Sequence, residues 1–297
     1  MTPSLGPRPA PTNAGCETIS GVTVDCPDVG RNPPQVLGVV SDLDGTLLRS
    51  DGSLSPTTMS VLGTLTGLGV PLVVATARTP RALQKVSGHQ RLGRVVCANG
   101  AIIWDAGRDE VVWESCFDPS ALADAVHRLR EALPGAGVAL LSARTMFLDE
   151  TYMELRRKRA DGAEVFADIE LILSRHRIAM VAVRHPRFVA DHILSPIVEA
   201  FAGVGVASFA GLSVVDIVPR TTTKAVAVAE EMTSKGCAAE ATVVFGDMPN
   251  DLPLFRWAGW ACAVANSHPA VLEAADEVVP SNNDDGVART VQRLVGP

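Results

Sequence analysis

Continuous apolar runs alternate with helical stretches along most of the chain. Valine-rich runs, typical of strands that are buried on both faces, end just before Asp42, Thr76 and Asp247. Between the first two runs, residues 55–69 have the spacing of a helix that Ser55 caps. Strands separated by helices predict a mainly parallel sheet with crossover helices, and we therefore expect an α/β protein.

A different pattern interrupts this alternation in the middle of the chain. Its periodicity predicts helices and strands over residues 122–133, 138–141, 178–183 and 191–201. The apolar strand pattern then resumes with SVVDIVP, residues 213–219. We therefore predict an inserted α+β domain within a first domain, with boundaries at residues 35–118 for the first part, 119–207 for the insertion and 208–297 for the second part. The proline- and glycine-rich residues 1–34 predict a disordered tail.

Charge and composition exclude several classes of protein. A formal net charge of −7 disfavours binding to nucleic acid or to anionic membrane surfaces. No apolar stretch has the length and continuity of a membrane-spanning helix, and the first residues lack the pattern of a secretory signal. The 6 cysteines have no metal-binding spacing. We expect a cytoplasmic protein without nucleic-acid or membrane partners, and these patterns leave its oligomeric state open.

Two acidic motifs follow apolar strands. DLDGT places Asp42 and Asp44 where one strand turns, and GDMPND places Asp247 and Asp251 after another. In parallel α/β sheets, ligands bind at the carboxyl ends of the strands. Carboxylates that converge there repel one another, and a divalent cation relieves the repulsion. Because Mg²⁺ prefers oxygen ligands, the two motifs together predict a magnesium site.

Two further residues are candidates for binding phosphate. Thr76 follows a buried strand, where its hydroxyl can donate a hydrogen bond to a phosphoryl oxygen. Lys224 begins a predicted helix, where its charge adds to that of the helix N-terminus. Either residue alone is weak evidence, because threonine at a strand end and lysine at a helix start are common in proteins.

Taken in order, DLDGT, Thr76 in ATAR, Lys224 after PRTTT, and GDMPND resemble the four motifs of the haloacid dehalogenase (HAD) superfamily of phosphohydrolases. CANGA at residues 97–101 and the stretch 263–288 are similar to the Cof-type branch of that superfamily. The resemblance covers residues 36–297. It implies a Rossmann-like HAD core with a parallel sheet and an inserted α+β cap domain, and such caps are associated with small phosphorylated substrates.

The resemblance also implies a role for each motif residue. Asp42 is expected to be the nucleophile that forms an aspartyl-phosphate, and Asp44 the general acid and base. Mg²⁺ is expected on Asp42, the Asp44 carbonyl and Asp247, with Asp251 in support. Arg78 is expected to support the site as well, although a surface ion pair fits it equally. The residues expected to bind the phosphoryl group are Leu43, Gly45, Thr76, Lys224 and Asn250.

Three functions remain open at this point. The first is a Mg²⁺-dependent phosphohydrolase that removes phosphate from small metabolites, sugar phosphates above all. A phosphomannomutase-like phosphotransferase would use the same aspartyl-phosphate but return the phosphoryl group to a sugar. A non-catalytic metabolite-binding protein of this fold would not need the catalytic carboxylates, whereas here each position has a competent side chain. The sequence therefore favours the hydrolase.

Overall fold

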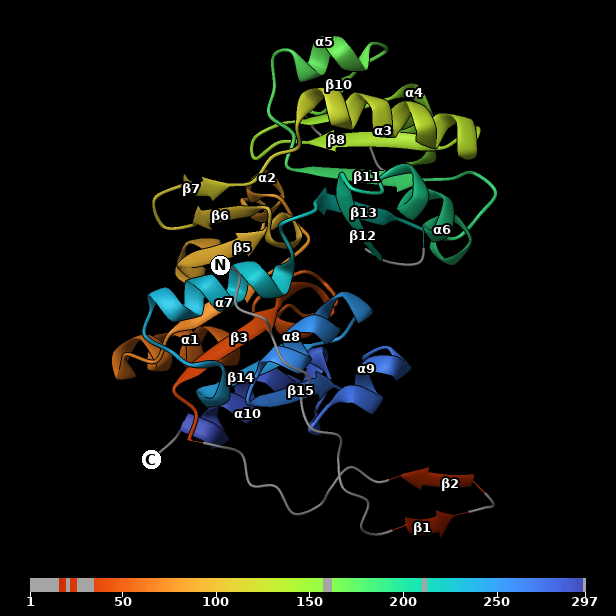
Figure 1. Cartoon of the computed structure of the whole chain (residues 1–297). Coiled ribbons are helices and arrows are strands. Elements are labelled where there is room, and N and C mark those ends of the chain that lie inside the picture. Colours follow the sequence, from red (N-terminus) through yellow and green to blue (C-terminus); the bar gives the residue numbers. More distant parts are fainter. Residues whose placement is uncertain (1–15, 20–21, 26–34, 157–161, 210–212, 296–297) are drawn as a thin grey trace. The chain divides into compact units, whose positions relative to one another are not determined.

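The protein is described by a computed structural model over residues 16–19, 22–25, 35–156, 162–209 and 213–295 (Figure 1). The chain divides into two compact units. The first unit comprises Met1–Ser50, Ser55–Pro71 and Met232–Pro297, and the second comprises Asp51–Leu54 and Leu72–Glu231. The predicted boundaries at residues 119 and 207 stay a prediction.

Four strands of the first unit pair in parallel, and four strands of the second unit form a mixed set. In the first unit, β16, β15, β14 and β3 follow one another in parallel pairing. In the second unit, β4 pairs with β5 in parallel, whereas β6 and β7 are added antiparallel. The predicted α/β class is thus confirmed. The eight strands are β3 (Gly38–Asp42), β4 (Leu72–Ala75), β5 (Arg94–Cys97), β6 (Ile102–Asp105), β7 (Glu110–Glu114), β14 (Thr242–Gly246), β15 (Trp260–Val264) and β16 (Glu277–Val279).

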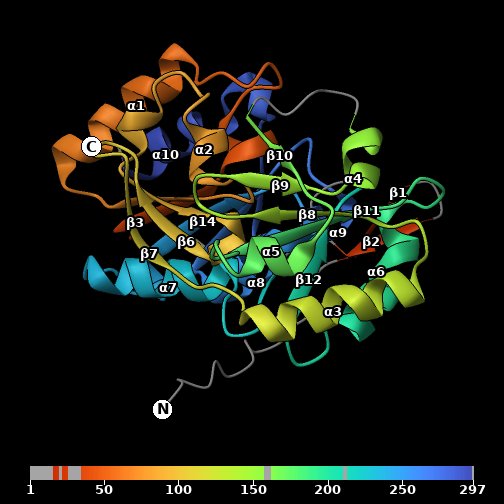
Figure 2. The same cartoon turned by 90° about the horizontal axis from the view of Figure 1, so that it is seen from above.

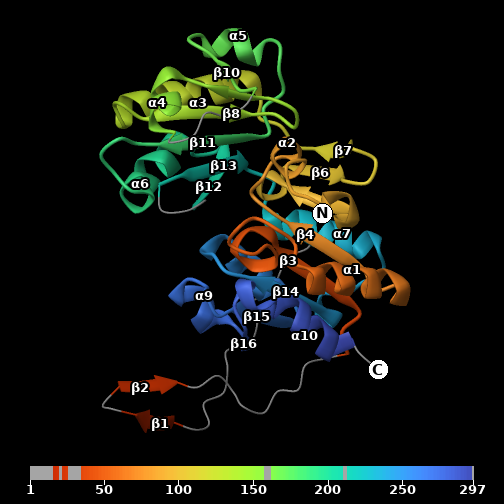
Figure 3. The ribbon, with the colours of Figure 1, turned by 180° about the vertical axis from the view of Figure 1, so that it is seen from behind.

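Helices cover both faces of the strands in the first unit. Helices α1 and α10 pack side by side on one face (Figures 2 and 3), and α8 lies on the other (Figure 2). This arrangement agrees with the right-handed crossovers that parallel strands require. The helices are α1 (Pro56–Leu68), α8 (Leu252–Trp257), α9 (Pro269–Ala274) and α10 (Gly286–Val295), and the short helical turns are η1 (Leu43–Leu47), η4 (Ala239–Ala241), η5 (Pro249–Asp251) and η6 (Asn282–Asp284).

Local sequence explains the ends of α1. The Ser55 side chain accepts a hydrogen bond from the Thr58 amide at 2.9 Å, and Pro56 occupies the first turn, where no amide hydrogen is needed. Gly69 ends the helix in the left-handed conformation with φ 69°, which glycine adopts without steric cost. The helix predicted over residues 55–69 is confirmed.

The second unit contains a six-stranded sheet of its own in the order β10-β9-β8-β11-β13-β12. Helices α3, α5 and α6 pack against one face around a buried apolar cluster that includes Leu122, Val181 and Ile217 (Figure 1). The strands are β8 (Gly137–Leu141), β9 (Met146–Leu148), β10 (Glu164–Val165), β11 (Met180–Arg184), β12 (Gly205–Phe209) and β13 (Val215–Pro219). The helices and turns of this unit are α2 (Pro80–Leu83), η2 (His89–Leu92), η3 (Ala98–Gly100), α3 (Pro119–Ala132), α4 (Glu150–Leu155), α5 (Ile169–Leu173), α6 (Ala190–Ala200) and α7 (Lys224–Ser234), of which α7 runs past the end of the unit.

The strand β13 differs from its predicted place. The predicted boundaries place residues 213–219 in the resumed first domain, but β13 pairs with β11 and β12 in the six-stranded sheet. The sequence does not decide between the two sheets, because a buried apolar strand has the same residue pattern in either one.

Two shorter segments also bear on the sequence predictions. Within residues 1–34, β1 (Cys16–Ile19) pairs antiparallel with β2 (Val22–Asp25). The disorder predicted for residues 1–34 stays a prediction, and the rest of this segment lies outside the described residues. Residues 79–88, where the sequence also favours a helix, form only the short α2. Among the described residues, no helix has the length and apolar character needed to cross a membrane.

Candidate active site

Two adjacent parallel strands bring their carboxyl ends together in the first unit. Strand β3 pairs with β14, and Ser41 lies opposite Phe245. Asp42 ends β3, and Asp247 directly follows β14. Both strands are buried along their whole length, because their apolar runs pack against helices on both faces. The register therefore brings two carboxylates to one edge of the sheet.

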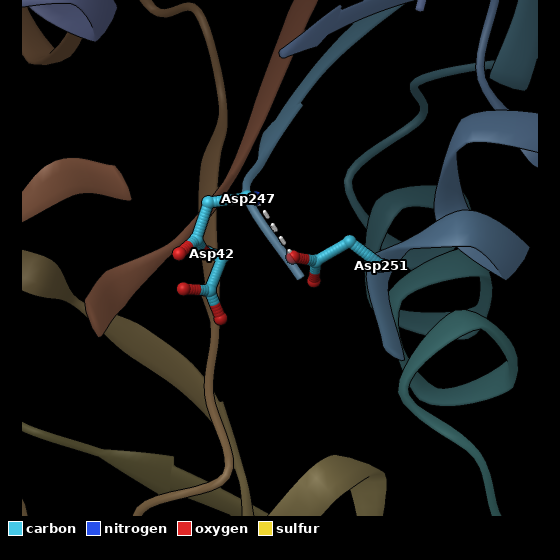
Figure 4. A group of neighbouring side chains, drawn as sticks. All are labelled: Asp42, Asp247 and Asp251. Carbon is cyan, nitrogen blue, oxygen red and sulfur yellow. Dashed lines mark hydrogen bonds between the residues drawn. The ribbon is translucent and has the colours of Figure 1, made fainter. Parts of the chain in front are cut away.

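A third carboxylate joins them to form a cluster of Asp42, Asp247 and Asp251 (Figure 4). One oxygen from each side chain lies within 4.8 Å of the others. The relative exposures of these residues are only 7%, 8% and 0%. Three negative charges so close together and so far from water repel one another strongly unless a cation compensates them.

Residues of the turn after β3 hold Asp247 in place. The Thr46 hydroxyl donates a hydrogen bond to Asp247 Oδ1 at 3.0 Å. Gly45 has φ +79°, and a Cβ atom added there would lie 2.4 Å from Asp247 Oδ2. Glycine is therefore required at this position both for the backbone conformation and for the close approach of the carboxylate.

Asp251 is fixed by the backbone of its own turn. Its Oδ2 accepts hydrogen bonds from the amides of Asp247 and Met248, both at 3.1 Å (Figure 4 shows the first). A Cβ atom at Gly246 would lie 2.7 Å from the same oxygen. Asp251 therefore both orders the loop after β14 and presents its carboxylate to the cluster.

The other predicted residues of the first unit lie next to the cluster residues along the chain, in the same two loops. Asp44 is exposed and has extended backbone angles, φ −81° and ψ 122°, within η1. The Leu43 side chain is fully buried, so only its backbone amide could reach a ligand. Asn250 lies in η5 and is partly exposed.

Three polar residues near the chain's end support these loops, and the sequence prediction did not single them out. The Asn266 side chain donates to the Gly45 carbonyl at 2.7 Å and accepts from the Asn282 amide at 2.9 Å. Asn282 in turn donates to the Leu48 carbonyl at 2.8 Å. The Ser267 hydroxyl donates to the Gly246 carbonyl at 3.2 Å. All three lie in the stretch 263–288, and its similarity to the Cof-type branch was the one available signal.

The carboxylate cluster fits a magnesium ion. Magnesium takes oxygen ligands at about 2.1 Å in an octahedron, so its ligand atoms lie at most about 4.2 Å apart. The span of 4.8 Å between the three carboxylates is close to that value. A hard cation would also compensate the buried charges, and neither histidine nor cysteine belongs to the set. Asp42, Asp247 and Asp251 therefore form a suitable donor set.

The remaining predicted residues, Thr76, Arg78 and Lys224, belong to the second unit. Thr76 directly follows β4 and is 1% exposed, and its Oγ1 accepts a hydrogen bond from the Arg78 amide at 3.0 Å. Lys224 begins α7 and is 4% exposed, which is unusual for a lysine. The structure thus brings three carboxylates together in one unit and holds two buried phosphate-binding candidates in the other.

Comparison with known proteins gives the family. The model of the haloacid dehalogenase-like hydrolases matches residues 39–291. "Putative phosphatase YxeH" of Bacillus subtilis is 24% identical over 275 residues, covering 86% of this chain and 97% of that protein. The "5-amino-6-(5-phospho-D-ribitylamino)uracil phosphatase YitU" of the same species is 25% identical, covering 84% of this chain and 94% of its own length.

A solved structure shows the same fold. SMU.1108c from Streptococcus mutans superposes with a TM-score of 0.76 at 21% identity, covering 88% of this chain and 100% of that one. The family match extends over both acidic motifs and over the whole middle of the chain. The chain therefore belongs to the haloacid dehalogenase-like hydrolase family.

Proposed function

We propose that this protein is a Mg²⁺-dependent phosphohydrolase that removes phosphate from small metabolites, with sugar phosphates as the leading class, through an aspartyl-phosphate on Asp42. Family membership and relatives of nearly full length that are named as phosphatases identify the enzyme as a phosphoric monoester hydrolase. The observation that carries the detailed proposal is the buried cluster of Asp42, Asp247 and Asp251 at the carboxyl ends of two parallel strands.

In this proposal, Asp42 and Asp44 perform two successive displacements at phosphorus. An Asp42 oxygen forms a bond to phosphorus while the bond to the substrate oxygen breaks, and Asp44 gives its proton to the leaving alkoxide. Asp44 then takes a proton from a water molecule, whose oxygen attacks phosphorus and releases Asp42. Asp44 thereby regains its proton and Asp42 its free carboxylate, and the phosphoryl group ends on the oxygen of the water. The exposure of Asp44 suits this role, because it must meet both the leaving group and water.

The cluster has the chemistry to hold the required cation, with the Asp44 carbonyl as a further ligand. When bound, Mg²⁺ supplies positive charge that offsets the repulsion between a phosphate dianion and the Asp42 carboxylate. Asp247 keeps its orientation through Thr46, and Asp251 through the amides of its own turn.

Binding of the phosphoryl oxygens is assigned to donors that are fixed before the substrate arrives. The backbone amides of Leu43 and Gly45 serve this role in the turn after β3. Thr76 and Lys224 supply a hydroxyl and a charge from buried positions. Such preorganised donors stabilise the charge that the transferring group develops in the transition state. The list of proposed donors is completed by Asn250, with Arg78 in support.

The substrate class rests on two supports. The second unit contains a six-stranded sheet with its own apolar core, the material for a cap that limits access to small molecules. One relative of nearly full length is named for an aminouracil that carries a phosphorylated ribityl group, which is a sugar alcohol unit. We therefore place phosphorylated sugars and sugar alcohols first among the substrates.

Hydrolysis assays test this function. The wild-type protein is offered p-nitrophenyl phosphate and a panel of sugar, sugar alcohol and nucleoside monophosphates, with Mg²⁺ and with EDTA. We expect phosphate release only with Mg²⁺, and the greatest kcat/KM on a sugar or sugar alcohol phosphate.

Two variants complete this test. Asp42→Asn removes the proposed nucleophile and should abolish turnover. Asp118→Asn is its matched control, because Asp118 caps α3 at the surface by accepting from the Ala121 amide at 2.9 Å, and asparagine caps a helix equally well. Full activity of Asp42→Asn, or equal activity with EDTA, would overturn the proposed mechanism.

A further inference from the structure

The turn η3 between β5 and β6 is buried, strained and unused by the mechanism above. Its residues Ala98, Asn99 and Gly100 have positive φ values of 49°, 50° and 106° in succession, and all three are buried. Alanine disfavours this region because its Cβ approaches a carbonyl oxygen, whereas asparagine tolerates it better. Conformations of this kind persist only where the surroundings hold them, and they concentrate at functional sites.

Backbone contacts connect η3 to both proposed phosphate-binding residues of the second unit. The Asn99 amide donates to the Thr76 carbonyl at 3.0 Å. A Cβ atom at Gly100 would lie 2.4 Å from the Thr223 carbonyl oxygen and 2.9 Å from the Lys224 nitrogen. The turn therefore touches the end of β4 and the start of α7, and a displacement of the turn would move both.

The side chain of Asn99 is held by a buried acid from the six-stranded sheet. Asn99 Nδ2 donates to Asp216 Oδ2 at 3.1 Å. Asp216 lies in β13 between Val215 and Ile217, which belong to the apolar cluster, so its side chain points to the opposite face of the sheet. On that face its neighbours in register include Ala182 of β11.

A buried carboxyl group such as that of Asp216 lowers the stability of the protein, so its presence in this strand indicates a function. Asp216 is only 4% exposed, and burial of a carboxyl group destabilises a protein unless hydrogen bonds compensate. The charged or titratable neighbours that influence it are Arg184 of β11 and Tyr152 of α4. Arg184 lies over the Tyr152 ring at 5.6 Å from its centroid. An apolar residue would serve packing alone better than this acid.

We propose that Asn99 and Asp216 are positioning residues for the phosphate site. The hydrogen bond between their side chains fixes the turn η3, and the turn sets the places of Thr76 and Lys224. This inference rests on the proposed function, because it assigns a purpose to residues that support the proposed phosphate donors.

Substitutions can separate the side chains from the backbone of the turn. Asn99→Gly keeps the positive φ but removes the amide, and Asp216→Leu removes the acceptor. With p-nitrophenyl phosphate and Mg²⁺, we expect each to lower kcat/KM by about tenfold or more, because small displacements of fixed donors have effects of this size. The inhibition constant of orthophosphate should rise in parallel. Asp216→Asn keeps an acceptor and should retain kcat/KM within about threefold of the wild type.

A coupling measurement distinguishes positioning from general destabilisation. In a Lys224→Ala background, Asn99→Gly should raise the orthophosphate inhibition constant much less than it does in the wild type, because the residue it positions is gone. Equal effects in both backgrounds would overturn the proposal, as would wild-type kinetics in both Asn99→Gly and Asp216→Leu. Thermal unfolding of each variant, with Asp118→Asn as control, confirms that it is folded.

The activity of the wild-type protein distinguishes a failure of this inference from a failure of the proposed function. A wild-type protein that hydrolyses no phosphate ester would remove the proposed function and the positioning role with it. An active wild type whose Asn99→Gly and Asp216→Leu variants are both equally active would remove the positioning role alone.

Discussion

The Thr46 hydroxyl donates a hydrogen bond of 3.0 Å to Asp247 across 201 residues of sequence, and it thereby orients one of the three clustered carboxylates. Residues that orient a metal ligand in this way contribute about tenfold to a hundredfold to metal affinity. We therefore expect Thr46→Val to weaken Mg²⁺ binding by that factor, measured by titrating Mg²⁺ against phosphatase activity. Thr46→Ser retains the hydroxyl and should stay near the wild type, and equal affinity in all three proteins would contradict this role.

Gly45→Ala should reduce activity far more than its backbone strain alone explains. The added methyl group would lie 2.4 Å from Asp247 Oδ2 and must displace that carboxylate. Gly52→Ala is a matched control, because Gly52 has nearly the same φ, +82° against +79°, but no atom lies within 4 Å of an added Cβ. Both variants should lose about 1 kcal/mol of unfolding free energy through strain, whereas only Gly45→Ala should lose most of its kcat. Equal kcat values in the two would refute the steric explanation.

Removal of divalent metal should destabilise the native protein. A cation bound among Asp42, Asp247 and Asp251 offsets their mutual repulsion, and it raises stability in proportion to the logarithm of its concentration above its Kd. We expect the Tm to rise with Mg²⁺ concentration in the wild type and to fall on addition of EDTA. In Asp247→Asn, which removes one charge and one ligand, this dependence on Mg²⁺ should be much weaker. A wild-type Tm that does not respond to Mg²⁺ would count against the metal site.

Asp216 should make stability depend on pH in a direction opposite to that of most acids. Burial raises the pKa of this carboxyl to about 7, although the Asn99 hydrogen bond and the Arg184 charge lower it in part. Between about pH 4 and about pH 7 the native state then keeps a proton that the unfolded state has released. The unfolding free energy therefore falls as pH rises through this window, by roughly 4 kcal/mol at most from this group.

Denaturant unfolding near pH 5 and near pH 8 measures this effect. Asp216→Asn cannot ionise, so its stability relative to the wild type should increase from the lower to the higher pH. Asp118→Asn is the control. The change in its unfolding free energy between the two pH values should stay closer to that of the wild type, since Asp118 is exposed and its hydrogen bonds lower its pKa. If the difference between Asp216→Asn and the wild type is the same at both pH values, Asp216 does not titrate in this window.

The strands that carry the acidic residues could be predicted from the sequence. Strands β3 and β14 are short, continuous apolar runs, and Asp42 and Asp247 follow them directly. Parallel strands share one carboxyl edge, so the convergence of these acids follows from the pattern once the sheet is assumed. The Asn-Gly pair after β5 is typical of a hairpin turn, and in the structure it joins β5 to β6.

What the sequence could not predict depends on contacts between distant segments. The side-chain hydrogen bonds from Thr46 to Asp247 and from Asn266 to Gly45 require loops that local propensity does not place. The sheet to which β13 belongs is decided by its partners, because its residues would suit either sheet. Asp216 within SVVDIVP is a polar residue in an apolar strand, and that contrast was a signal of the positioning role proposed for it.

Long-range contacts around the first acidic loop have a consequence for protein synthesis. Asp42 leaves the ribosome early, but the loop that follows it is stabilised by residues that are translated much later. The three contacts are Thr46 to Asp247, Arg49 to Asp285, and Leu48 to Asn282, at separations of 201, 236 and 234 residues. A nascent chain therefore exposes its proposed nucleophile without the acids that would bind metal beside it. Because domains assemble only when their parts have been translated, the growing chain is expected to have no phosphatase activity until the segment through residue 285 has emerged.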